Sequence, residues 1–167
     1  MSSDVQGVSY YERATGTNSD GTPTFATDAD SDSEQHVIGV LSREWGCEIA
    51  HFGKLCPVDF YVLKHGRLAA IMELKTRSHN AARFATVFLN VRKWLALTMA
   101  SVALGVPAIY CVRFTNEIRW VNVLAIDARR VRMGGCMEVV KSRSDVEPVI
   151  EVGVAIMKAV KWATSSR

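Results

Sequence analysis

Residues 56–77, CPVDFYVLKHGRLAAIMELKTR, decide the fold. They contain two apolar runs, residues 58–63 and 67–76, on either side of a short polar segment that includes Gly66. Runs rich in β-branched and aromatic residues around a glycine-containing turn predict a β-hairpin. We therefore expect two adjacent antiparallel strands at the centre of the fold.

Three charged side chains interrupt these strands, namely Asp59 in the first and Glu73 and Lys75 in the second. Because side chains alternate between the two faces of a strand, Glu73 and Lys75 project from the same face. Burying a carboxylate and an ammonium group is costly unless each has a partner or a task. The pattern favours a functional role for these residues over an exposed ion pair, which would contribute only roughly a few tenths of a kcal/mol to stability.

The length of the turn decides whether the two acids meet. A two-residue turn would place Asp59 opposite Met72, on the other face from Glu73. A three-residue turn, which pairs Lys64 with Leu68, would place the two carboxylates opposite each other, and the glycine can supply the positive φ that such a turn requires. We predict the three-residue turn, or a β-bulge with the same effect.

Two carboxylates side by side repel each other unless a cation lies between them. Asp59, Glu73 and the backbone carbonyl of Leu74 would form an oxygen site suited to Mg²⁺ or Mn²⁺. Lys75 would orient a water molecule or stabilise charge on a phosphoryl group. Glu34 would accept a proton or bind the metal through water, or else act only as a first-turn acid favoured by the helix dipole. These groups are the ones that metal-assisted phosphodiester hydrolysis requires.

The surrounding sequence predicts an α/β fold. Helical spacing of apolar residues indicates helices over about 32–45 and 90–104, and strands are expected at 47–52, 108–114 and 118–126. The order αβββαββ indicates a mixed central sheet flanked by helices. The inward stripe of the second helix is expected to consist of Val91, Trp94, Leu95, Thr98 and Val102.

The motif V-D-F-Y-V, a hairpin and then A-I-M-E-L-K resembles the PD-(D/E)XK nuclease superfamily, whose core is αβββαβ with this spacing. Asp59, Glu73 and Lys75 match its signature residue by residue. Glu34 matches the helix-one acid that many members possess. The signature proline usually precedes the aspartate immediately, whereas Pro57 is one position earlier.

The resemblance covers residues 33–126 and implies a restriction-endonuclease-like core with a divalent metal. More loosely, the later elements look like those of phage- or prophage-encoded nucleases grouped with Holliday-junction resolvases. The resemblance therefore implies a DNA substrate, with branched or structured DNA as the narrower expectation.

Charge is distributed unevenly along the chain. Residues 1–33 hold six acidic side chains and one basic one, whereas residues 34–167 hold nineteen basic and eleven acidic side chains, a net charge of +8. A basic domain favours a polyanionic partner such as DNA, although solubility alone would also explain it. We expect Lys93 and Arg92, in the first turn of the second helix, and Arg77 to contact phosphate.

The chain is expected to form one domain behind a leader. Residues 1–31 are polar and acidic, and we expect them to be flexible because they cannot bury enough apolar surface to order themselves. Residues 32–167 are expected to form a single nuclease-like domain, with the core at 33–126 and a C-terminal extension at 127–167. Within that extension, residues 146–152 predict a short edge strand.

Composition and the lack of targeting signals argue against non-globular, membrane-spanning and secreted classes of protein. The mixture of 49% hydrophobic and 22% charged residues is typical of globular proteins. Residues 94–112 carry no charge, but a glycine and a proline divide them into a helix and a strand, so no membrane span is expected. Scattered cysteines and a polar N-terminus favour the cytoplasm, that of the host if the gene is phage-encoded.

The sequence thus predicts a Mg²⁺- or Mn²⁺-dependent deoxyribonuclease. The rival is a catalytically inactive nuclease-fold module that binds nucleic acid or a protein partner. A third interpretation is a small α/β protein without any nucleic-acid role. Symmetric cutting of two strands would require a homodimer.

Overall fold

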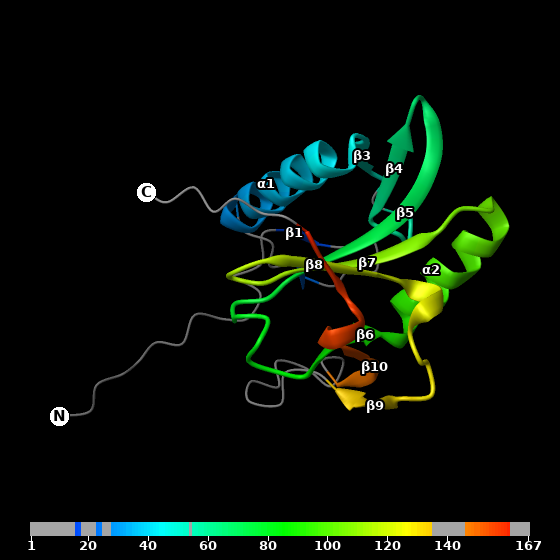
Figure 1. Cartoon of the computed structure of the whole chain (residues 1–167). Coiled ribbons are helices and arrows are strands. Elements are labelled where there is room, and N and C mark those ends of the chain that lie inside the picture. The colour runs from blue at the N-terminus through cyan, green and yellow to red at the C-terminus, as the bar shows by residue number, and fades with distance from the viewer. Residues whose placement is uncertain (1–15, 18–22, 25–27, 54, 135–145, 161–167) are drawn as a thin grey trace. The chain divides into compact units, whose positions relative to one another are not determined.

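The computed structural model describes residues 16–17, 23–24, 28–53, 55–134 and 146–160 (Figure 1). The chain divides into two compact units, Met1–Gln35 and His36–Arg167. The first unit contains a short antiparallel pair, β1 (Gly16–Thr17) with β2 (Pro23–Thr24), and the beginning of helix α1 (Asp28–Trp45). Most of the expected leader lies outside the described residues, so its flexibility stays a prediction.

The second unit is built on a six-stranded sheet with the strand order β11-β8-β7-β5-β4-β3. Its strands are β3 (Glu48–His51), β4 (Phe60–Lys64), β5 (Arg67–Thr76), β7 (Ala108–Arg113), β8 (Ile118–Asn122) and β11 (Lys158–Val160). Strands β5 and β7 are parallel, and the other neighbouring strands are antiparallel. Because parallel strands need a crossover, the chain passes from β5 to β7 through helix α2 (Val91–Leu104). The predicted α/β fold with a mixed sheet is confirmed.

Different elements cover the two faces of this sheet. On one face, Leu41 of α1 shares a core with Met72 of β5. On the other face, Leu97 of α2 shares a core with Ile71 of β5. Since alternate residues of a strand point the same way, Glu73 lies on the α2 face with Ile71. Helix α2 therefore lies on the side of the sheet from which the predicted catalytic residues project.

A second, three-stranded antiparallel sheet has the order β6-β10-β9. Its strands are β6 (Thr86–Asn90), β10 (Glu147–Gly153) and β9 (Val131–Gly134). The prediction of an edge strand at 146–152 is therefore wrong, because β10 is the middle strand. Pro148 is accommodated there because the pairing with β6 starts only at Val149, so no backbone N–H is needed from the proline on that side.

The hairpin turn is shorter than predicted. Lys64 pairs with Arg67, and the two residues between them, His65 (φ 53°) and Gly66 (φ 71°), both have positive φ. This conformation matches the twist of a two-residue hairpin, so the predicted three-residue turn is wrong. The predicted alternative, a β-bulge with the same effect, is confirmed, because the pairing shifts between Val62 and Leu63 and this restores the register that the three-residue turn would have given.

The ends of both helices follow local signals. The side chain of Asn90 accepts a hydrogen bond of 2.7 Å from the backbone N–H of Arg92, and α2 ends at Gly105, whose φ is 65°, as predicted. Helix α1 begins about four residues earlier than predicted, at Asp28. The aspartates at positions 28, 30 and 32 fall in its first turns, where the helix dipole favours negative charge.

The predicted inward stripe of α2 is partly wrong. The buried residues of the helix are Leu97 and Ser101, whereas Leu95 and Val102 are exposed. The hydroxyl of Ser101 donates a hydrogen bond of 2.6 Å to the carbonyl of Val106. A serine that satisfies its hydroxyl in this way can be buried, which hydrophobic periodicity alone does not reveal.

None of the helices among the described residues is long and apolar enough to cross a membrane. The uncharged run at 94–112 ends its helical part at Leu104, and strand β7 begins at Ala108.

Candidate active site

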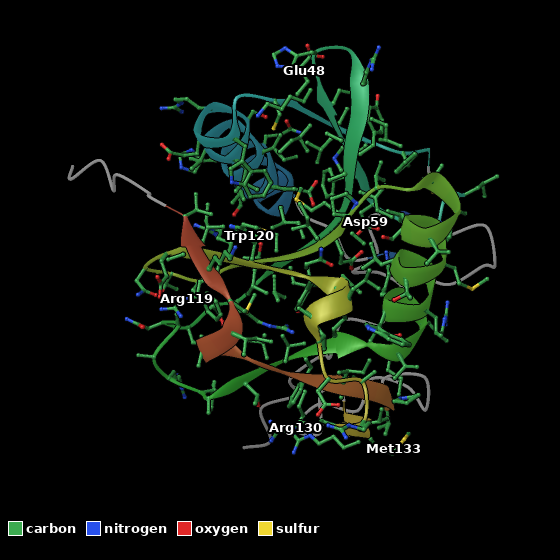
Figure 2. All side chains as sticks on the ribbon, turned by 45° about the vertical axis from the view of Figure 1, so that its right-hand side comes forward. Glu48, Asp59, Arg119, Trp120, Arg130 and Met133 are labelled. Carbon is green, nitrogen blue, oxygen red and sulfur yellow. The ribbon has the colours of Figure 1, made fainter. Side chains whose placement is uncertain are left out.

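The register of the hairpin brings Asp59 and Glu73 side by side. Phe60 pairs with Met72, so Asp59, which precedes β4, lies next to Glu73 of β5. The side chain of Asp59 is 34% exposed, whereas that of Glu73 is completely buried. Figure 2 shows Asp59 beside α2, and Glu48 near the opposite end of the hairpin. An acid pair thus lies at the edge of the core, open to solvent on the Asp59 side.

Two lysines contact this pair. The ammonium group of Lys93, in the first turn of α2, donates a hydrogen bond to Oδ1 of Asp59 and lies 2.9 Å from Oε2 of Glu73. Nζ of Lys75 lies 3.4 Å from Oε1 of Glu73. The side chain of Lys75 is more exposed than that of Lys93. Two carboxyl groups and two ammonium groups therefore form one cluster that joins β4, β5 and α2.

The cluster separates the pKa values of its two acids. Burial and the neighbouring Asp59 together raise the pKa of Glu73 to about 7, against the lowering effect of the charges of Lys75 and Lys93. Burial also acts to raise the pKa of Asp59, but the hydrogen bonds with Glu73 and Lys93 and the charges of the two lysines together outweigh it, and the pKa of Asp59 is lowered. Burial acts to lower the pKa of Lys93, but the two acids outweigh it and the pKa is raised. Asp59 and Lys93 are therefore charged at neutral pH, and Glu73 exchanges its proton near pH 7.

The donor set fits a divalent cation. Asp59 and Glu73 supply adjacent carboxylate oxygens, which Mg²⁺ and Mn²⁺ prefer, and Leu74 lies next to Glu73 in β5. Among the residues that the structure describes, no group of three or more acidic, histidine or cysteine side chains gathers at one point. Glu34 belongs to the first unit, and its role and that of the Leu74 carbonyl stay predictions.

The basic residues expected at phosphate line one large hollow of about 1190 Å³ beside the cluster. Lys75 and Lys93, which contact the acid pair, line it together with Arg77 and Arg92. A guanidinium nitrogen of Arg77 donates a hydrogen bond of 3.3 Å to the carbonyl of Phe88. The hollow thus adjoins the acid pair through the two lysines, and the predicted phosphate-binding residues line it.

Sequence reasoning did not anticipate the contact between Lys93 and the acid pair. It placed Lys93 at phosphate because first-turn backbone N–H groups attract anions. The available signal was topological, because a crossover helix between β5 and β7 must begin near the end of β5 that carries Glu73. The lining residues of β9 and β10 could not be anticipated, because their pairing with β6 is non-local.

The fold and the cluster define a PD-(D/E)XK nuclease-like protein. Residues 21–160 match the family described as "Phage putative PDDEXK endonuclease". The chain belongs to this phage PDDEXK endonuclease family.

Among solved structures, the chain is similar to Hjc, a Holliday junction resolvase from the archaeal hyperthermophile Archaeoglobus fulgidus. The TM-score is 0.50 at 10% sequence identity, and the likeness covers 75% of this chain and 84% of Hjc. At this identity the likeness shows the fold alone. A search of curated proteins finds no match.

Proposed function

We propose that the chain is a Mg²⁺- or Mn²⁺-dependent deoxyribonuclease that hydrolyses phosphodiester bonds. Membership of a nuclease family supports the class of reaction. The observation that carries the proposal is the meeting of Asp59 and Glu73 with Lys75 and Lys93, two lysines that line a hollow together with further basic residues.

Each residue of the cluster has a distinct role in this proposal. Asp59 and Glu73 would hold the metal, together with the carbonyl of Leu74, and Glu34 is a further acid that would act through water. Bound there, a divalent cation supplies a Lewis acid for the phosphoryl oxygen and makes water more acidic. Lys75 orients the attacking water or stabilises charge on the phosphate.

Basic residues beyond the cluster position the substrate. Arg77 and Arg92 contact phosphates of the DNA strand that lies in the hollow, which fixes its register without reading its sequence. Lys93 has two roles in the proposal, because it neutralises the acids in the metal-free protein and would face phosphate in the metal-bound one. Binding through these residues weakens as salt concentration rises.

We extend the proposal to branched or structured DNA on the basis of the looser resemblance to resolvases. The solved structure of Hjc, by its title a Holliday junction resolvase, has a similar fold. Symmetric cleavage of a junction would require a homodimer, and a phage enzyme would act in the host cytoplasm.

A nicking assay on supercoiled plasmid and on branched DNA, with Mg²⁺, Mn²⁺ or EDTA, tests the proposal. We expect cleavage with either metal, none with EDTA, and none from Asp59→Ala or Glu73→Ala. The matched control is Glu48→Ala, which removes an exposed acid of β3 near the turn end of the hairpin and keeps full activity. DNA binding without cleavage under every condition would favour the inactive nuclease-fold module instead.

A further inference from the structure

One face of the second sheet forms part of the lining of the hollow. In β6, β10 and β9 the side chains of Phe88, Glu151, Val149 and Arg132 all line it. Phe88 is opposite Glu151, and Val149 is opposite Arg132, so these four share a face. The alternate side chains, such as Leu89, join the core beneath α2. The C-terminal extension is thus continuous with the active site.

This face carries a guanidinium group held in a fixed position. The guanidinium carbon of Arg132 lies 4.5 Å from the ring centroid of Phe88, and Nε lies 3.2 Å from Oε1 of Glu151. The side chain is nevertheless 55% exposed. Glu151 reduces the positive charge of the hollow, but it also orients Arg132, so that the planar group is presented to solvent beside β6.

A half-exposed aromatic ring stands at the far end of β6. Phe84 is 52% exposed and lines the hollow. Its ring meets the ring of His79 edge-on at 4.9 Å, and His79 packs in turn on the buried Phe114 at 5.7 Å. The guanidinium carbon of Arg83 also lies 5.3 Å from the centroid of Phe84. The ring of Phe84 is thus packed against His79 and Arg83, although nothing among the described residues buries it.

An exposed ring in a basic groove is the arrangement that binds single-stranded nucleic acid, because bases stack on the ring while basic groups follow the backbone. A base inside a duplex is already stacked on both sides and cannot reach such a ring. The volume of the hollow, about 1190 Å³, exceeds the roughly 300–1,000 Å³ of small-molecule pockets. These observations favour an unpaired strand over both a duplex and a small ligand.

We propose that the hollow seats an unpaired DNA strand, with one base stacked on Phe84 and a phosphate bound by Arg132. The inference rests on the proposed function and specifies its substrate as DNA with unpaired nucleotides near the cut. Ala85 and the five residues of β6 separate Phe84 from α2, and at about 3.3 Å per residue these six residues span about 20 Å. At about 3.4 Å per stacked nucleotide, the unpaired base lies within about six nucleotides of the metal site.

DNA binding measured in EDTA tests the unpaired-strand inference, because the metal chelator prevents cleavage. The full chain is titrated against a fluorescent single-stranded oligonucleotide and against the corresponding blunt duplex, and anisotropy is measured. We expect Phe84→Ala to weaken binding of the single strand about tenfold, since one stacked base contributes a factor of that order. Binding of the duplex changes less than twofold, and Phe84→Trp retains single-strand binding. Leu124→Ala, which truncates another exposed apolar residue outside the lining of the hollow, is the matched control.

A second pair of variants tests the phosphate contact. Arg132→Ala lowers the salt dependence of single-strand binding by about one counterion, whereas Arg129→Ala, a 91% exposed arginine outside the lining, leaves it unchanged. Equal losses for single strand and duplex in Phe84→Ala, or no loss in either, would overturn the inference. If wild type binds and cleaves duplex DNA and Phe84→Ala behaves like wild type, the unpaired-strand inference fails while the proposed nuclease function stands. If no DNA binds or is cut, the proposed function fails as well.

Discussion

Nζ of Lys93 lies 2.9 Å from Oε2 of Glu73, although the two residues come from α2 and β5. The same ammonium group donates a hydrogen bond to Asp59. A positive charge thus stands between two carboxyl groups that would otherwise repel each other. A divalent cation that uses the same oxygens must compete with this lysine.

Because of this competition, we expect Lys93→Met to destabilise the metal-free protein but to strengthen the binding of Mn²⁺. Without metal, the variant loses the charge that compensates a buried acid, so its melting temperature falls. With Mn²⁺, the metal no longer displaces an ammonium group, so the dissociation constant for Mn²⁺ falls about tenfold or more. Thermal melting and calorimetric titration measure the two effects.

Arg67→Met is the matched control for Lys93→Met, because it removes an exposed cation at the hairpin turn and should change neither quantity. Weaker Mn²⁺ binding in Lys93→Met would mean that the lysine supports the metal and does not compete with it.

The raised pKa of Glu73 predicts an unusual pH dependence of stability. In the folded, metal-free protein this pKa is about 7, against an ordinary value of 4.5. Between these values the folded state holds a proton that the unfolded state has lost, so the free energy of unfolding decreases as pH rises from about 4.5 to 7. Urea denaturation in EDTA at several pH values measures this, and Glu73→Gln should flatten the profile over this range.

Metal binding should have the opposite pH dependence. Mn²⁺ binds the deprotonated carboxylate, so its affinity increases as pH approaches 7. For the metal-free wild-type protein in EDTA, a free energy of unfolding that rises with pH between about 4.5 and 7 would contradict the assignment of the raised pKa to Glu73.

Local signals explain the parts of the fold that the sequence predicts. Strand β5 occupies the predicted residues 67–76, because apolar residues predominate in this run and polar residues bound it. Helix α2 lies between a capping asparagine, Asn90, and Gly105, as its sequence indicates.

Non-local pairing explains the parts that the sequence does not predict. Strand β6 pairs with residues about sixty positions away in β10, and a five-residue run carries little signal of its own. The predicted register, which brings Asp59 to Glu73, is confirmed, but it depends on a bulge beside Val62, since the two-residue turn alone would separate the two acids. The bulge has no sequence mark, so its position could not be predicted.

The second sheet has a steric requirement at Gly134. A Cβ atom at this position would lie 2.5 Å from Cγ2 of Val149 in the neighbouring strand. We expect Gly134→Ala to destabilise the protein by about 1–3 kcal/mol, because the strands cannot separate without losing their hydrogen bonds. Urea denaturation measures the loss.

Val149→Ala in the Gly134→Ala background should recover part of the stability, because it removes the methyl group that clashes. Additive losses in the double variant would show that the two positions do not interact. Gly153→Ala is the matched control, because a Cβ atom there would meet no atom within 4 Å.

Lys75 should affect cleavage much more than binding. Its Nζ lies 3.4 Å from Glu73 and its side chain is 45% exposed, so it can reach a bound phosphate without supporting the core. We expect Lys75→Met to lower the cleavage rate in Mg²⁺ by about 100-fold or more, as removal of a group that orients water or stabilises charge does. The affinity for DNA in EDTA should change less than threefold, because several other basic residues line the hollow.

Lys64→Met, at the turn end of the same hairpin, is the control for Lys75→Met and keeps full activity. Cleavage by Lys75→Met at the wild-type rate would exclude Lys75 from the reaction and leave it a role in balancing the charge of Glu73.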